Sequence, residues 1–210
     1  MKNYIVEFIG TFFLVLVIGL TGNPIAIGSV LMVMVYMGGH ISGAHYNPAV
    51  TLAIWIRKKI ELKDALMYMM FQLMGAMTAA IFFHLIWGWD VKFAPAPNHA
   101  INILKPLFIE IAFTFALALV VLNVATSKKT AGNSFYGMAI GFTVLAAAFA
   151  GGPISGGAYN PAVGMGPIIV DTLSGGSSIN HLWLYLVGPC TGAAAAAMAF
   201  KMLNPEEFQG

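Results

Sequence analysis

The chain has 210 residues, of which 59% are hydrophobic and only 9% are charged. These charges are too few to cover the surface of a water-soluble globule of this size. We therefore expect a single domain, residues 1–210, that lies in a lipid bilayer and leaves little room for any soluble domain.

Long apolar segments follow one another along the chain. A membrane-spanning helix needs about 20 mostly apolar residues. Six segments approach or meet this length: 4–21, 24–39, 65–87, 104–125, 135–150 and 181–203. The sequence thus predicts an all-α, multi-pass membrane protein.

The basic residues fall mainly on one side of this six-span arrangement. Eight of the ten do so: Lys2, Arg57, Lys58, Lys59, Lys63, Lys128, Lys129 and Lys201. Because cytoplasmic loops carry an excess of Lys and Arg, we expect both termini to be cytoplasmic, with the cell membrane as the location. This basic face is expected to lie against the inner leaflet, so the sequence gives no support for nucleic-acid binding.

Two apolar spans each contain a carboxylate, Glu7 and Glu110, within a shared pattern Glu-x-x-x-Thr-Phe. A carboxylate at membrane depth is costly and demands a reason. One interpretation is a coupling or proton-relay group. The other, which we favour, is a brace that accepts hydrogen bonds from backbone N–H groups of a loop held inside the protein.

One ten-residue stretch occurs twice, as ISGAHYNPAV at 41–50 and as ISGGAYNPAV at 154–163. Asn is among the best N-cap residues, and Pro is favoured at the first helical position. Each copy therefore predicts a short helix entered through a glycine-rich loop. Its first residues are Pro48 and Ala49 in one copy, and Pro161 and Ala162 in the other.

Other landmarks recur in the same order, so the chain consists of two copies of one unit, 1–98 and 99–210. Each unit holds three full spans, an odd number, so the second copy must be inverted. The first short helix has about ten residues, or ~15 Å, which is half of a bilayer. We expect Asn47 and Asn160 to meet at the midplane, each capping its own helix and leaving its NH₂ for a passing molecule.

This combination of paired Asn-Pro-Ala motifs, matched Glu-x-x-x-Thr-Phe spans and Gly-Ala segments resembles the aquaporin, or major intrinsic protein, family over almost the whole chain. The resemblance implies passive conduction of water or small uncharged solutes, one pore per subunit and a homotetramer. We expect no cofactor and no metal. The resemblance also implies an outer selectivity ring, whose four positions are Ile27, Ala148, Gly157 and Val163.

The chain departs from the family pattern at Val163, where most members carry Arg. Water-selective members usually add an aromatic residue and a His to the ring, but Ile27 and Ala148 are apolar. We expect a wider and less polar ring than in a strict water channel. Val at this position resembles one group of plant tonoplast intrinsic proteins, which conduct water along with other small neutral solutes.

Two histidines and four alternative functions remain to be considered. His45 either lines the inner vestibule or packs against loop carbonyls, and His40 is expected to be structural. A solute facilitator with water secondary stays open, and so does a secondary transporter, because inverted repeats also build transporters. An ion channel lacks a charged ring or carbonyl filter in the sequence. An enzyme is disfavoured because His45, His181 and Cys190 show no catalytic spacing.

Overall fold

The computed structural model describes residues 1–208, and within that range it contains eight α-helices and no β-strand. Six helices are long and apolar enough to cross a membrane: α1 (Lys2–Thr21), α2 (Pro24–Ser42), α4 (Leu62–Trp87), α5 (Leu104–Val121), α6 (Tyr136–Ser155) and α8 (Leu182–Leu203). The two shorter helices are α3 (Pro48–Ile56) and α7 (Pro161–Leu173). The predicted all-α class with six spans and two half-helices is confirmed.

Two spans extend further than the sequence indicated. Helix α2 continues to Ser42 rather than to residue 39, and α6 continues to Ser155 rather than to residue 150. The helices end at Gly43 (φ 87°) and Gly156 (φ 88°), both in the left-handed conformation that glycine adopts without steric cost. These later glycines, and not the earlier glycine pairs, therefore end the helices.

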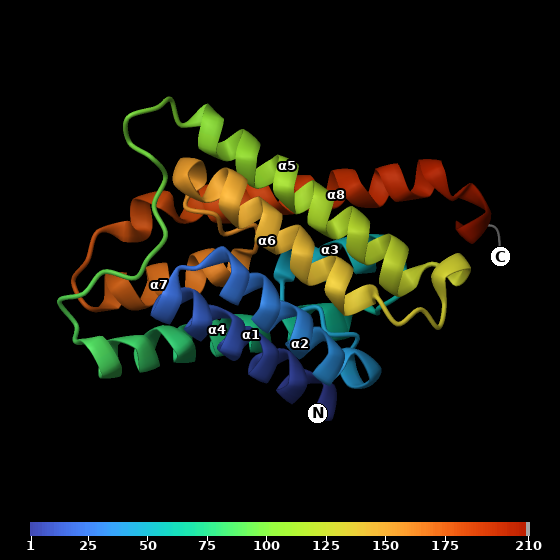
Figure 1. The fold of residues 1–210 in the computed structure, drawn as a ribbon, viewed down its shortest axis with the longest axis horizontal. Helices are drawn as coiled ribbons and strands as arrows, with labels where there is room; N and C mark the ends of the chain where they lie inside the picture. Colours follow the sequence, from blue (N-terminus) through green and yellow to red (C-terminus); the bar gives the residue numbers. More distant parts are fainter. Residues whose placement is uncertain (209–210) are drawn as a thin grey trace.

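The order of two long helices, one short helix and one long helix occurs twice along the chain. Within each half the outer helices pack along each other, α1 against α4 and α5 against α8. The halves interlock, because α3 packs against α8 and α7 packs against α4 (Figure 1). Since α3 and α7 meet at their N-termini and extend in opposite directions, the two repeats are inverted, as predicted.

Close packing within each half depends on one small residue in the last helix. A Cβ on Gly75 of α4 would meet the carbonyl oxygen of Phe8 in α1. A Cβ on Gly192 of α8 would likewise meet the carbonyl oxygen of Ile111 in α5. The backbones of each helix pair thus approach too closely for any larger side chain, as is common between membrane helices.

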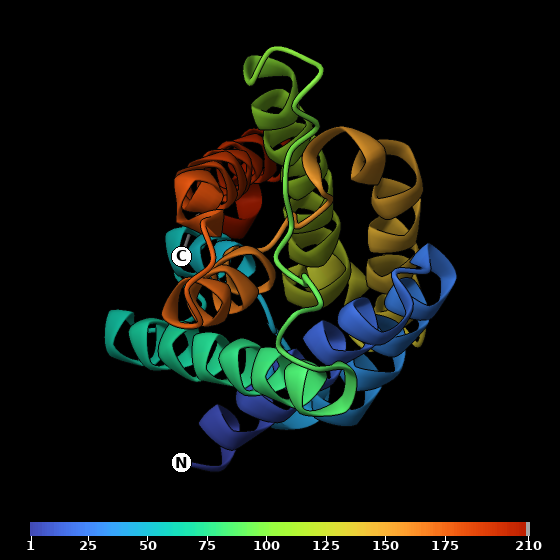
Figure 2. The ribbon, with the colours of Figure 1, turned by 90° about the vertical axis from the view of Figure 1, so that its left-hand side faces the viewer.

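Residues 88–103 link the halves at one end of the bundle, which we term the link end. In Figure 1 this link lies at the left-hand end, and in Figure 2 it passes in front of the bundle. It is attached to α6, because the backbone N–H of Asn98 donates to the carbonyl oxygen of Ile154 at 3.0 Å. The link therefore covers part of that end of the protein.

The opposite end carries Arg57, Lys128 and the C-terminal segment, and we term it the basic end. Here the Glu207 carboxylate accepts from Arg57 (2.6 Å), from the Ser127 hydroxyl (2.6 Å) and from the Lys128 N–H (2.8 Å). The Ser127 hydroxyl bond, the Lys128 N–H and the positive charge of Arg57 lower the pKa of Glu207. The C-terminal segment thereby fastens the end of α3 to the loop between α5 and α6.

Candidate functional site

The two half-helices begin with the same capping arrangement. The Asn47 side-chain oxygen accepts from the N–H groups of Ala49 (2.8 Å) and Val50 (3.4 Å). The Asn160 oxygen accepts from the N–H of Ala162 at 2.9 Å. Each Asn thus satisfies a backbone donor that its own helix leaves free, and the proline at the first helical position has no donor to satisfy.

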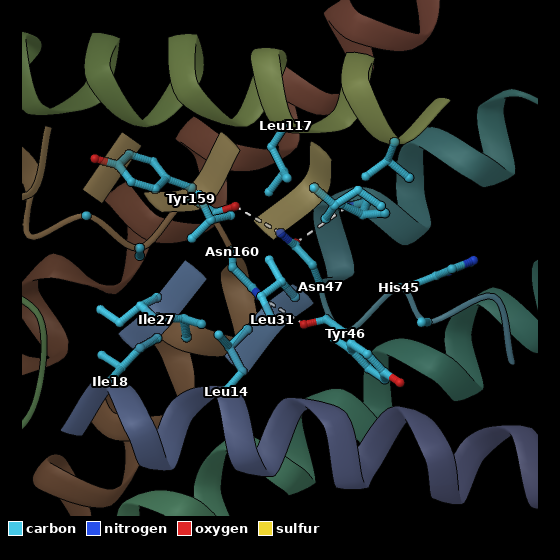
Figure 3. A pocket seen from close by; sticks show the side chains of 18 residues that line it. Leu14, Ile18, Ile27, Leu31, His45, Tyr46, Asn47, Leu117, Tyr159 and Asn160 are labelled. Atoms are coloured by element: carbon cyan, nitrogen blue, oxygen red, sulfur yellow. Dashed lines mark hydrogen bonds between the residues drawn. The ribbon is translucent and has the colours of Figure 1, made fainter. Parts of the chain in front are cut away.

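The amide nitrogens of the two asparagines cross between the halves. Asn47 Nδ2 donates to the Tyr159 carbonyl oxygen at 3.0 Å, and Asn160 Nδ2 donates to the Tyr46 carbonyl oxygen at 2.9 Å (Figure 3). An amide NH₂ carries two hydrogens. One hydrogen of each Asn is therefore held by the opposite half, and only the second is left for a passing molecule. From the sequence we expected the whole NH₂ group to be free for that molecule.

Tyr46 and Tyr159, directly before the two asparagines, were not identified from the sequence. Both have a φ of 48°, a left-handed conformation that non-glycine residues seldom adopt. Their hydroxyls donate to the carbonyl oxygens of Met34 and Ala147, each at 2.9 Å. The tyrosine rings thus hold the strained loops against α2 and α6, and the repeat of Tyr in both motifs was the available signal.

Glu7 holds the first loop through both of its oxygens. Oε1 accepts from the Ser42 hydroxyl (2.6 Å) and the His45 N–H (3.0 Å). Oε2 accepts from the Tyr46 N–H (2.7 Å) and from Nε2 of Gln72 (2.8 Å). Because every partner is a donor, both oxygens act as acceptors, as those of an ionised carboxylate do.

Glu110 makes the matching contacts in the second half. Its Oε1 accepts from the Ser155 hydroxyl (2.7 Å) and the Ala158 N–H (3.0 Å), and its Oε2 accepts from the Tyr159 N–H (2.7 Å). No residue of this half takes the place of Gln72 among its partners in the described chain. Glu7 and Glu110 are both fully buried.

A narrow central cavity surrounds the two asparagines, with a volume of about 30 Å³. A water needs about 10–15 Å³ measured this way, so the space holds about two waters. Its wall is mostly apolar (Figure 3). Apolar side chains come from four long helices: Leu14, Ile18, Ile27, Leu31, Leu117, Val121, Ile140 and Val144.

Three of the four positions predicted for the outer ring line this cavity: Ile27, Gly157 and Val163. Ala148 lies on α6, half-buried, and is not among the residues that line the cavity. Val144, one turn earlier on the same helix, does line it. Val144 and the leucines of α1 and α5 were not predicted from the sequence, because an apolar span gives no sign of which face meets the pore.

His45 lies at the edge of the central cavity, toward the basic end. Its Nδ1 lies 3.1 Å from the Thr51 hydroxyl, and its ring packs edge-on against Tyr68. His40 lines a wider cavity at the basic end. Within residues 1–208 no three His, Cys, Asp or Glu side chains lie close enough to hold a metal ion.

Six membrane-spanning helices in two inverted repeats, with two half-helices that meet at a narrow cavity, define a multi-pass membrane channel. The model of the family described as "Major intrinsic protein" matches residues 16–200. The chain belongs to this family of passive channels for water and small neutral solutes, and it is not an enzyme.

Relatives of this chain carry two kinds of name. It is 35% identical over 217 residues to "Aquaporin NIP1-1" of Oryza sativa subsp. japonica, covering 97% of this chain and 74% of that protein. It is 34% identical over 220 residues to "Glycerol uptake facilitator protein-like 6" of Lactiplantibacillus plantarum, covering 99% and 100%. The aquaglyceroporin structure from Plasmodium falciparum matches with a TM-score of 0.86 at 22% identity, over 100% of this chain and 99% of that one, so it bears on the fold alone.

Proposed function

We propose that this protein passively conducts water together with at least one of ammonia, hydrogen peroxide, urea or glycerol, through a pore whose outer ring lacks a positive charge. The observation that carries the proposal is the wall of the central cavity. Apart from loop backbone, its polar side chains are Asn47, Asn160, His45 and the tyrosines that precede the asparagines. A molecule with lone pairs therefore meets few donors at the centre and an apolar wall on either side.

Cations are excluded in this proposal by the two half-helices. The positive ends of the α3 and α7 dipoles converge on the cavity, and the asparagines offer only N–H donors to it. A cation would lose its hydration shell in a cavity of about two waters and find no anionic partner there. Neutral solutes escape this electrostatic penalty.

The missing ring arginine is not supplied from elsewhere in the chain. The only arginine, Arg57, lies at the basic end, where it pairs with Glu207 and packs between the rings of Phe200 and Phe208. Val163 is 5% exposed and lines the cavity. We infer that Ile27, Gly157 and Val163, with Ala148 further along α6, form an outer ring that selects by width rather than by charge.

The alternative functions differ in which solute matters and in whether transport is coupled. The names of the relatives fit both a water channel and a facilitator for which water is secondary. Coupled transport through a carboxylate would need that group in the path, but Glu7 and Glu110 do not line the cavity and hold loop N–H groups. We therefore assign these two carboxylates as braces. The tonoplast likeness depends on Val163 alone and does not decide the substrate.

We further propose how the channel is divided into repeats, how it is oriented in the membrane and how it assembles. The division into repeats 1–98 and 99–210 places its boundary within the link. The excess of basic residues at one end supports cytoplasmic termini in a cell membrane. Large apolar side chains exposed along the helices, such as Phe108, Phe142 and Met198, support contact with lipid and with the other subunits of a homotetramer.

The experiment that tests the proposed ring replaces Val163 by Arg, with Val163→Leu as a control that stays uncharged. Stopped-flow swelling of proteoliposomes measures water, urea and glycerol permeability. The Arg variant adds up to five donors and a positive charge, so we expect it to keep water flow and lose at least 10-fold in urea and glycerol permeability, an order-of-magnitude expectation for a narrowed ring. Equal solute permeability in the wild type and the Arg variant would contradict the placement of the ring.

A further inference from the structure

The central cavity and the open space of the basic end share lining residues, and we term the place where they adjoin the inner neck. One wide cavity there has a volume of about 460 Å³ and is lined by residues of α2, α6 and the loop between α5 and α6. Among the described residues, Ile140 of α6 is the one that lines both this cavity and the central one. Ile140 is 5% exposed, so it separates a space of many waters from a space of about two.

His45 also lines the inner neck. A second open cavity, of about 360 Å³, shares His45 with the central cavity. The two open cavities share Gly43, Ala125 and Thr126, so together they form one vestibule. In Figure 3 the His45 ring extends away from the two asparagines. A molecule that moves from the centre to the vestibule therefore passes cavity walls that include an isoleucine and an imidazole.

The repeat relates this neck to the outer ring. Ile140 holds the same place before Ser155, the last residue of α6, as Ile27 holds before Ser42, the last residue of α2. Both isoleucines line the central cavity, one toward each of its ends. The pore thus carries an inner isoleucine that mirrors the outer one.

The flanking positions mirror each other as well. Val50 and Val163 both follow Asn-Pro-Ala, and Ala44 and Gly157 both stand three residues before the Asn. All four line the central cavity. Because Val163 stands where most family members carry a charged residue, the outer ring has no charged side chain. These matched positions therefore give the two ends of the cavity similar apolar walls.

The ends differ at one matched position, because His45 of the first loop corresponds to Ala158 of the second. His45 is fixed by Thr51 and by the ring of Tyr68, so it presents a positioned polar group to the neck. The inner neck therefore combines an apolar wall with one hydrogen-bonding partner, whereas the outer ring has no such side chain.

We propose that Ile140 is a specificity-determining residue that limits the size of the solutes admitted through this inner neck, which His45 also lines. This proposal depends on the proposed conduction of neutral solutes. It locates a second size filter at the basic end, where the sequence alone indicated only an outer ring. Solutes with the width of glycerol must therefore pass two apolar constrictions that are lined by similar side chains. Widening either one should relieve only part of the restriction on solute size.

The first test measures permeability ratios. Ile140→Ala should raise the ratio of glycerol to water permeability at least about threefold in proteoliposome swelling, whereas Met138→Ala, an exposed change on the same helix, should leave it unchanged. Ile140→Phe should lower glycerol permeability by a similar factor. If the wild type conducts and Ile140→Ala has the same permeability ratio as Met138→Ala, the role of Ile140 is refuted while the proposed function stands. If wild type passes neither water nor any solute, the proposed function fails, and the inference fails with it.

The second test locates the residue through its accessibility, which does not depend on the solute chosen. Cys190 is the single cysteine, so a Cys190→Ser background carries no other thiol. In vesicles of one orientation, a charged methanethiosulfonate should block water flow through Ile140→Cys only from the side of the basic end. It should block Ile27→Cys only from the side of the link end. Reaction of the thiol at position 140 from the link-end side, or from neither side, would overturn the inference.

Discussion

Removing a brace carboxylate should destabilise the loop that it holds by an amount that the contacts determine. Glu7→Ala leaves the N–H groups of His45 and Tyr46 without an acceptor, and both residues are buried. At about 1–3 kcal/mol for each unpaired group, the loss is about 2–6 kcal/mol. Glu110→Ala strands two N–H groups in the same way and should cost a similar amount.

Replacement by glutamine should lower the stability of the two sites by different amounts. In Glu7→Gln the new NH₂ faces one of two pairs of groups. It faces either the His45 N–H and the Ser42 hydroxyl, which must then reverse to accept, or the Tyr46 and Gln72 donors, so two contacts are lost or rearranged in either orientation. In Glu110→Gln the new NH₂ can take the place of Oε2, where it faces the Tyr159 N–H alone and only one contact is lost. We therefore expect Glu7→Gln to be the more destabilising change, by about 1 kcal/mol or more.

Thermal unfolding in detergent, followed by tryptophan fluorescence, measures these differences, with proteoliposome swelling as the functional readout. Glu61→Gln, at an exposed carboxylate before α4, is the matched control and should unfold like the wild type. The order of stability should be wild type, Glu110→Gln, Glu7→Gln, Glu7→Ala. A Glu7→Gln protein that unfolds at the wild-type temperature but no longer conducts would refute the brace assignment and favour a relay group.

Two further predictions concern the centre of the pore and the packing around it. Asn47→Asp and Asn160→Asp place a negative charge where two positive helix ends converge, so neutral conduction should fall and cation leakage in planar bilayers should rise. Unchanged leakage in folded variants would count against these positions. Gly151→Ala puts a Cβ against the Tyr159 hydroxyl and should lower the unfolding temperature, whereas a Cβ at neighbouring Gly152 meets nothing within 4 Å. Gly152→Ala should therefore be neutral or stabilising by up to about 1 kcal/mol, and equal behaviour of the two would show that the tyrosine does not pack there.

The fold could be predicted from the sequence because the features that determine it are local or repeated. Apolar length gave the six spans, and the Asn-Pro pairs gave the start of each half-helix. The ends of α2 and α6 were placed too early, because a glycine inside an apolar helix looks the same in sequence as one that ends it. Only the left-handed backbone at Gly43 and Gly156 distinguishes them.

The site was predicted less completely, because its geometry depends on contacts between the halves. The asparagines were identified as caps, but their bonds to the carbonyl groups of Tyr46 and Tyr159 arise only when the two loops face each other. In the sequence, Glu7 and Glu110 stand in the same Glu-x-x-x-Thr-Phe pattern and look equivalent. The pairing of Gln72 with Glu7, on a helix far along the chain, makes the two sites unequal.

Passive conduction of neutral molecules through an uncharged pore is the property on which the proposed function depends. Stopped-flow light scattering of wild-type proteoliposomes tests it most directly, with water, urea, glycerol, ammonia and hydrogen peroxide offered one at a time and K⁺ flux measured on the same vesicles. We expect water flow above protein-free vesicles, flow of at least one larger solute, and no K⁺ flux. Strict selectivity for water, or K⁺ flux above that of protein-free vesicles, would contradict it.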